Sequence, residues 1–348
     1  YEIMPSLVGS EMCIRDSPKH EWISEIPFDE LPRIRSPKGG IIVTANNKIV
    51  DDEYPYYLNL DYSTEYRARL IFERISSISN VSVDEMSSIH SERTSIPAQT
   101  FIKEIKKIQS RIKDPFTVAV AESLIRWNCS MEPTLYEPTV YSEFRKILHK
   151  KIIFSLMGEK LASKMFFGGG RGAPRHLSHL GSLFVSMVEK GDESFLPEGQ
   201  TWDSIILDAF NESVFELRKS LGENLDNWIW GEIHQTNPRH TLSESFPGYA
   251  EILNPPSISI GGDADTPQAA GYSFESYSVT GMSVARYVFD TSNWDNSKWI
   301  VPLGSSGHPG SKHYSDQSEV WGEVGLVPML YNWDSIMQSA ETTQILNP

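Results

Sequence analysis

The chain has 348 residues, of which 39% are hydrophobic and 22% charged, a composition typical of globular protein and not of a disordered chain. Its 46 acidic and 31 basic side chains give a formal charge of -15, so broad electrostatic attraction to nucleic acid or to anionic lipid is not expected. No run of about 18 apolar residues occurs, so the sequence predicts no membrane span.

The first 17 residues, YEIMPSLVGSEMCIRDS, show no helical or strand period and resemble translated adapter sequence. We interpret residues 1–17 as an adapter-derived artefact and residues 18–348 as the protein proper. On this interpretation the natural N-terminus, with any signal peptide, lies outside the sequence. Setting Cys13 aside leaves Cys129 alone, and a lone cysteine favours a small buried hydrophobe over a nucleophile or a disulfide.

The elements that surround the candidate site come first in the chain. Residues 18–38 read as irregular, and the β-branched run Ile41–Thr44 predicts a short buried strand. The polar pair Asn46 and Asn47 follows the run directly. Apolar residues then recur at helical spacing, which predicts an amphipathic helix over Arg67–Ile78.

The middle of the chain is predicted to be largely helical and the C-terminal region largely β. A helix is expected from Trp202 to Leu221, ended by Gly222, and the glycine-rich run Gly168–Gly172 reads as a loop without the Lys-Ser/Thr ending of a phosphate cradle. The other expected helices are Val83–His90 after a Ser82 cap, Phe101–Ile112, Thr117–Arg126 and Tyr141–Leu156. The expected strands are Ser257–Ile260, Ser283–Phe289 and Trp299–Val301. The fold class that follows is α+β.

Four segments carry a family resemblance, and their order matters more than any one of them. They are residues 40–47 (GIIVTANN) with 52–57 and 66–69; 228–234 (WIWGEIH); 261–266 (GGDADT) with 281–286 and Asp290; and 302–309 (PLGSSGHP) with 312–317 and Trp321. Together they resemble the penicillin acylase, or penicillin amidase, family of N-terminal-nucleophile hydrolases. The chain is similar to the C-terminal part of the family's β subunit.

The resemblance implies both a fold and a reaction. The fold is part of an αββα arrangement, in which two antiparallel sheets lie between helical layers. In the reaction, an N-terminal serine exposed by self-cleavage of a zymogen attacks an amide carbonyl, and its own α-amino group acts as the base. The acyl-enzyme is then hydrolysed. The implied substrate is an N-acyl amide: an acylated β-lactam, an acyl-homoserine lactone or another acylated amine.

Two residues match the family's active-site positions. Asn46 falls on the asparagine whose amide donates hydrogen bonds to the oxyanion, and Arg67 falls on the helix arginine that orders the polar groups around it. Arg67 also suits a substrate carboxylate. Without the resemblance, Asn46 would read as a turn residue, as Asn47 still does, and Arg67 as part of a solvated face.

The main departure from the family is the nucleophile. No serine in this chain begins a plausible mature subunit, so either the sequence is truncated or the protein is catalytically incomplete. The expected partners are the missing upstream α chain and the N-terminal part of the β chain, with a small acylated amine as substrate and neither nucleic acid nor membrane. Alone, this chain is not expected to turn over. The alternative is a non-catalytic binding or assembly module on the same scaffold.

The reaction requires no cofactor, and we assign no cofactor-binding or metal residue. The family carries a structural calcium whose ligands lie mostly upstream; Asp61 is near one such position, but its spacing differs. The family also implies a periplasmic or secreted location. The remaining polar cluster fits neither a zinc pattern nor a Gly-x-Ser-x-Gly elbow, so we interpret it as loop structure: Ser305, Ser306, His308, His313 and Asp316. The scattered tryptophans favour core or interface.

Overall fold

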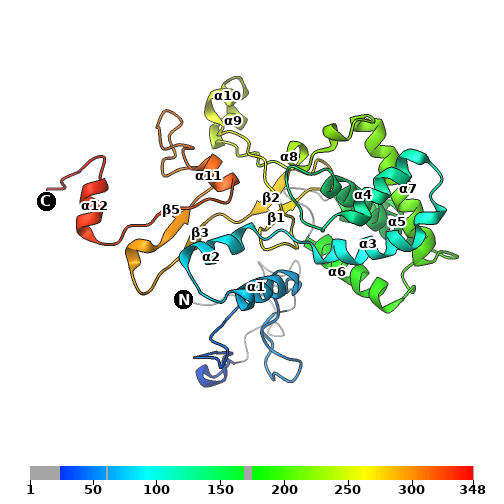
Figure 1. Cartoon of the computed structure of the whole chain (residues 1–348), viewed down its shortest axis with the longest axis horizontal. Helices are drawn as coiled ribbons and strands as arrows, with labels where there is room; N and C mark the ends of the chain where they lie inside the picture. Colours follow the sequence, from blue (N-terminus) through cyan, green and yellow to red (C-terminus); the bar gives the residue numbers. More distant parts are fainter. Residues whose placement is uncertain (1–23, 60–61, 168–174, 348) are drawn as a thin grey trace.

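The computed structural model describes residues 24–59, 62–167 and 175–347. The segment 1–17, Asp61 and the run Gly168–Gly172 lie outside the described residues, so the expectations about them stay predictions. In Figure 1 the long helices gather on one side of the molecule, the short strands lie in the middle, and the last helix lies at the opposite end.

The long helices form one packed group with its own core. They are α3 (Ile96–Ile108), α4 (Pro115–Arg126), α5 (Glu137–Phe167), α6 (Arg175–Lys190) and α7 (Trp202–Leu221). Phe144 of α5 lies between Phe101 of α3 and Phe210 of α7, with ring centroids 5.6 Å and 6.3 Å apart. All three rings are fully buried, and such edge-to-face pairs add to the free energy gained from burial.

Helix boundaries follow from caps that the sequence contains. Helix α7 has the predicted bounds, because Thr201 caps its start and Gly222, with φ 83°, ends it. Helix α3 begins earlier than predicted, since the Ser95 side chain accepts a hydrogen bond from the backbone N–H of Ala98. Helix α5 continues past the predicted end to Phe167, although Gly158 with φ 71° interrupts its helical backbone.

Two helices lie next to the candidate site. Helix α1 (Tyr66–Ser77) confirms the predicted helix within one residue at each end. Helix α2 (Val83–Ser88) begins with a capping box in which Ser82 and Glu85 satisfy each other's backbone N–H groups, and a 3-10 turn, η4 (Ile89–Ser91), continues it. Helix α2 lies beside β3, and α1 packs against η4 and lies below α2 in Figure 1.

The predicted strand Ile41–Thr44 is wrong. This segment has no regular structure, and Ile42 is 57% exposed where a buried strand would cover it. A β-strand is held by hydrogen bonds to a neighbouring strand, and none of the described strands pairs with these residues. The β-branched composition therefore did not indicate strand pairing here.

The C-terminal region contains every strand of the described residues, in two small antiparallel sheets. One sheet pairs β1 (Ala270–Tyr272) with β2 (Val279–Met282), and the other has the order β3 (Arg286–Val288), β4 (Lys298–Ile300), β5 (Val327–Pro328). The predicted runs 283–289 and 299–301 contain or overlap β3 and β4, whereas 257–260 forms only an isolated bridge between Ser259 and Gln235. A small second core lies here: Ile260, Ala270, Ile300 and Trp321.

Short helices complete the chain, and the fold class is α+β as predicted. Among the described residues, no helix has the length and apolar character needed to cross a membrane. The short α-helices are α8 (Trp230–Ile233), α9 (Thr241–Ser245), α10 (Ala250–Leu253), α11 (Ser318–Gly322) and α12 (Trp333–Ser339). The other 3-10 turns are η3 (Phe28–Glu30), η5 (Gln109–Arg111), η6 (Leu225–Trp228), η7 (Pro247–Tyr249) and η8 (Trp294–Asn296).

Candidate active site

Asn46 lies in a bend directly after the irregular segment 41–44. Its φ is 64°, a left-handed conformation that asparagine adopts more readily than most residues. The bend is held from two sides: the Ser63 N–H donates to the Asn46 carbonyl over 2.8 Å, and the Ala45 N–H donates to Oδ1 of Asn47 over 3.0 Å. Asn47 therefore acts as the turn residue that the sequence predicted, and the side chain of Asn46 is not used in the turn.

The side chain of Arg67 contacts Asn46, so the two predicted site residues lie together. Arg67 is the second residue of α1 and is half-buried. Its Nη2 donates to the carbonyl oxygen of Ala45 over 2.8 Å and to Oδ1 of Asn46 over 3.0 Å. Burial lowers the pKa of Arg67, and the negative charge of Asp265 opposes that shift. One nitrogen on a regular helix thus fixes both the backbone and the side chain of the bend.

This contact determines which way the Asn46 amide faces. An arginine has only hydrogen-bond donors, so the atom that faces Nη2 must be the amide oxygen. The Nδ2 group, with two N–H donors, then points away from Arg67, and it donates to none of the described residues. Asn46 also lines a cavity of about 510 Å³, together with Asn47, Ile49, Leu58, Asn59, Tyr62 and Ser63.

A buried ion pair joins α5 to the third sequence motif, and one of its aspartates acts on the start of α1. Arg145 of α5 lies 2.8 Å from Asp265 and 3.9 Å from Asp263, and all three side chains are buried. Burial, then the nearby Asp265, raises the pKa of Tyr66 to about 12. Asp265 is therefore close to both Tyr66 and Arg67, the first two residues of α1, and its charge acts on the arginine that holds Asn46.

The loop that carries the two aspartates depends on a glycine. Gly262 has φ 85°, and a Cβ at that position would lie 2.1 Å from the carbonyl oxygen of Gln268. Within the loop, Oδ1 of Asp263 accepts a hydrogen bond from the Asp265 N–H over 2.7 Å. Sequence reasoning used this segment only as a family motif. The available signal was the Gly-Gly-Asp-x-Asp pattern itself, because acidic residues beside a glycine turn are commonly fixed by the fold.

The other residues considered at the sequence level take structural roles. Nδ1 of His313 lies 2.7 Å from Oδ2 of Asp316, and Nδ1 of His308 accepts the Gly310 N–H over 3.0 Å. Across the part of the chain that the structure describes, no three His, Cys, Asp or Glu side chains are arranged to hold a metal ion. The family's structural calcium stays a prediction. Cys129 is buried, and burial raises the pKa of its thiol to about 11.

Comparison with known proteins decides the family. The model of the family described as penicillin amidase matches residues 9–338 of this chain. The chain belongs to the penicillin amidase family. Penicillin acylase 2 proenzyme from Pseudomonas sp. strain SE83 is 35% identical over 335 residues, which cover 95% of this chain and 42% of that protein. The family fold is that of N-terminal-nucleophile hydrolases, as the sequence implied.

Two further relatives bear on the fold and on the family's range. The solved structure of a thermostable penicillin G acylase from Alcaligenes faecalis matches 94% of this chain and 60% of that chain, with a TM-score of 0.58 and 17% identity, and so shows the shared fold. The acyl-homoserine lactone acylase QuiP from Pseudomonas putida is 28% identical over 105 residues. The chain spans less than half the length of the proenzyme that it matches.

Proposed function

We propose that this penicillin amidase family chain is part of an amide hydrolase that cleaves an N-acyl amide through a serine acyl-enzyme. In this proposal Asn46 supplies one donor of the oxyanion hole. The observation that carries the proposal is the 3.0 Å hydrogen bond from Arg67 to Oδ1 of Asn46, because it turns the Nδ2 donors away from Arg67 and leaves them available to a ligand.

Amide hydrolysis requires a hydrogen-bond donor that is neutral and held in a fixed position near the oxyanion. Attack on an amide carbonyl gives a tetrahedral intermediate whose oxygen carries negative charge, and hydrolysis of the acyl-enzyme passes through a second one. Donors that are already oriented stabilise this charge without reorganising, and losing one such donor costs about 3 kcal/mol. Arg67 restrains the bend on one side and Ser63 on the other, which supports a preorganised amide.

The nucleophile is proposed to come from the upstream part of a longer protein. The serine, its α-amino base and a second, backbone donor would lie on that segment, which also makes the protein a self-processed proenzyme with α and β chains. The coverage of the proenzyme relative, 42%, supports this proposal. The present chain alone is not expected to hydrolyse amides.

The proposed substrate is a small acylated amine. The printed names of the relatives, a penicillin acylase and an acyl-homoserine lactone acylase, support an acylated β-lactam or an acyl-homoserine lactone as the substrate class. The cavity of about 510 Å³ beside Asn46 has room for a molecule of this size. A periplasmic or secreted location and a structural calcium held by upstream residues belong to the same proposal.

The reading frame upstream of Pro18 and the activity of its product test the proposal. A Gly-Ser or Ala-Ser junction that is cleaved to leave an N-terminal serine, followed by turnover of a chromogenic acyl amide, is the expected result. Mass spectrometry should then detect an acyl adduct on that serine. A genuine start codon near Pro18, or a correctly processed protein that forms no adduct and hydrolyses no acyl amide, overturns the proposal in favour of a non-catalytic module.

A further inference from the structure

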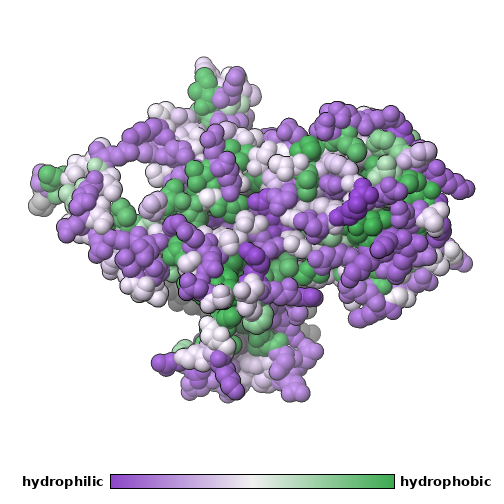
Figure 2. Space-filling view, in the orientation of Figure 1, coloured by the Kyte–Doolittle hydropathy of each residue, from purple (hydrophilic) through white to green (hydrophobic). Residues whose placement is uncertain are grey.

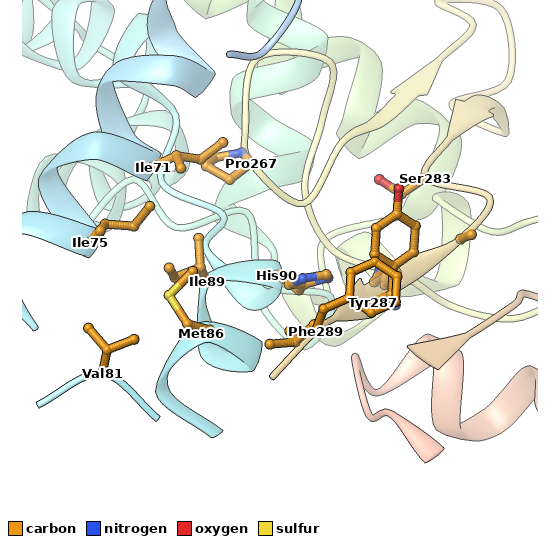
Figure 3. Close-up of a pocket in the computed structure, with 13 residues that line it drawn as sticks. Ile71, Ile75, Val81, Met86, Ile89, His90, Pro267, Ser283, Tyr287 and Phe289 are labelled. Atoms are coloured by element: carbon orange, nitrogen blue, oxygen red, sulfur yellow. The ribbon is translucent and has the colours of Figure 1, made fainter. Parts of the chain in front are cut away.

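A second pocket lies between α1, the α2–η4 segment and β3, away from Asn46. Its volume is about 620 Å³, which suits a small organic ligand. Figure 3 shows His90 at its centre, with Ile71 and Ile75 on one side and Tyr287 and Phe289 on the other. On the face drawn in Figure 2, apolar residues gather over α2 and β3 in the middle of the molecule. The wall of this pocket is therefore mainly apolar.

One charged residue lines this pocket, and it is buried. Arg286, the first residue of β3, is only 4% exposed, and its guanidinium stacks 4.3 Å from the ring centroid of Trp321. Nη1 donates to the Trp321 carbonyl, which occupies one of its five donors. Among the described residues no carboxylate lies within ion-pair distance of Arg286, and burial lowers its pKa to about 10. A buried cation without a counter-ion is costly to the fold.

Neighbouring charges do not supply the missing counter-ion. Arg93 adds positive charge that further lowers the pKa of Arg286, and Arg93 is itself paired with Glu132. Asp84 on α2 already forms an ion pair with Lys298, with 2.7 Å between Oδ1 and Nζ. The charge of Arg286 is therefore not balanced by these neighbours, which favours an anionic ligand.

We propose that this pocket binds an apolar carboxylic acid in its ionised form. The carboxylate pairs with the free donors of Arg286, and the hydrocarbon tail lies against Ile71, Ile75 and Met86. Arg–carboxylate pairs are strong because two N–H groups can match two oxygens, and an apolar wall excludes the water that would screen them. The pocket thus contains a partner for each part of the ligand: the guanidinium for the carboxylate and the apolar wall for the hydrocarbon tail.

This site is distinct from the candidate active site. The two cavities share no lining residue. They are nevertheless connected through α1, since Arg67, Ile71 and Ile75 follow at steps of four residues along one face of the helix. The proposal does not rest on amide hydrolysis, because it depends only on the buried charge of Arg286 and the apolar lining.

Titration of the protein with decanoate and, separately, with decanol tests the proposal by isothermal calorimetry. Decanoate is expected to bind at least about tenfold more tightly than decanol, since only decanoate carries the anion. Arg286→Met should remove that preference and leave decanol binding unchanged, whereas Arg126→Met, which changes an exposed arginine elsewhere, should alter neither.

A second variant keeps the test informative if Arg286→Met fails to fold. Tyr287 is 54% exposed, so Tyr287→Ala should fold and weaken both ligands several-fold by removing part of the apolar wall. Equal affinity of the wild-type protein for decanoate and decanol, or no binding of decanoate, overturns the proposal. So does a Tyr287→Ala variant that binds both ligands as the wild-type protein does.

Discussion

Nη2 of Arg67 donates one hydrogen bond to Oδ1 of Asn46 over 3.0 Å and another to the carbonyl of Ala45 over 2.8 Å. Arg67 belongs to a regular helix of 12 residues, whereas Asn46 lies in a bend without a strand to support it. The geometry of the asparagine amide therefore depends on the arginine. This dependence links the rigid part of the fold to the proposed chemistry.

Arg67→Lys in the complete, processed protein should lower kcat for a chromogenic acyl amide by roughly tenfold or more, with a smaller change in KM. The lysine side chain is shorter, and its flexible ammonium lacks the fixed planar geometry with which the guanidinium holds Nη2 between the two oxygens. Steady-state kinetics measure the effect. Arg69→Lys on the same helix, where Arg69 pairs with Glu73 at 2.9 Å on the surface, is the matched control and should keep wild-type kinetics. Wild-type kcat in Arg67→Lys would show that the contact does not position the site.

Arg145→Met should destabilise the protein by about 3–5 kcal/mol, because it leaves Asp263 and Asp265 buried without their cation. Urea unfolding followed by tryptophan fluorescence measures the loss. Arg111→Met removes an exposed pair with Asp203 at 3.7 Å and should cost less than about 1 kcal/mol. If the two variants lose similar stability, the buried pair is not the anchor of this loop.

Stability should fall as the pH rises through the range in which Asp263 loses its proton. Burial and the neighbouring Asp265 raise the pKa of Asp263 from 3.8 to about 7, so between these values the folded protein binds more protons than the unfolded chain. Raising the pH through this window therefore lowers the free energy of unfolding. Urea unfolding at about pH 5 and about pH 8 should show a drop that Asp263→Asn removes, since asparagine stays neutral. An equal drop in Asp263→Asn would refute the assignment.

Local sequence signals predicted the helices well and the strands less well. Helix α7 has its predicted bounds because Thr201 and Gly222 mark both ends within the sequence itself. Ile41–Thr44 has strand composition, but a strand also needs a partner, and pairing is a tertiary property that composition does not carry. For the same reason 257–260 forms only a single bridge.

The assignment of the candidate site residues rests on the family resemblance, and the contacts between them could not be predicted from the sequence. The family resemblance placed Asn46 and Arg67, but only the structure shows that one donates to the other. The effect of the Asp265 charge on Arg67 joins residues about 200 positions apart in the chain. The contact of Arg286 with Trp321 joins residues 35 positions apart. Neither contact produces a periodic pattern in the sequence, so both could be recognised only in the structure.

Asn46→Asp and Asn46→Gly in the complete, processed protein test the central claim, that the Asn46 amide stabilises the oxyanion, most directly. Glycine tolerates the φ of 64° without strain, and aspartate keeps an oxygen facing Arg67 while losing both N–H donors. We predict that each lowers kcat for a chromogenic acyl amide by roughly 10²–10³-fold, with the melting temperature nearly unchanged. Wild-type kcat in either folded variant would contradict the assignment.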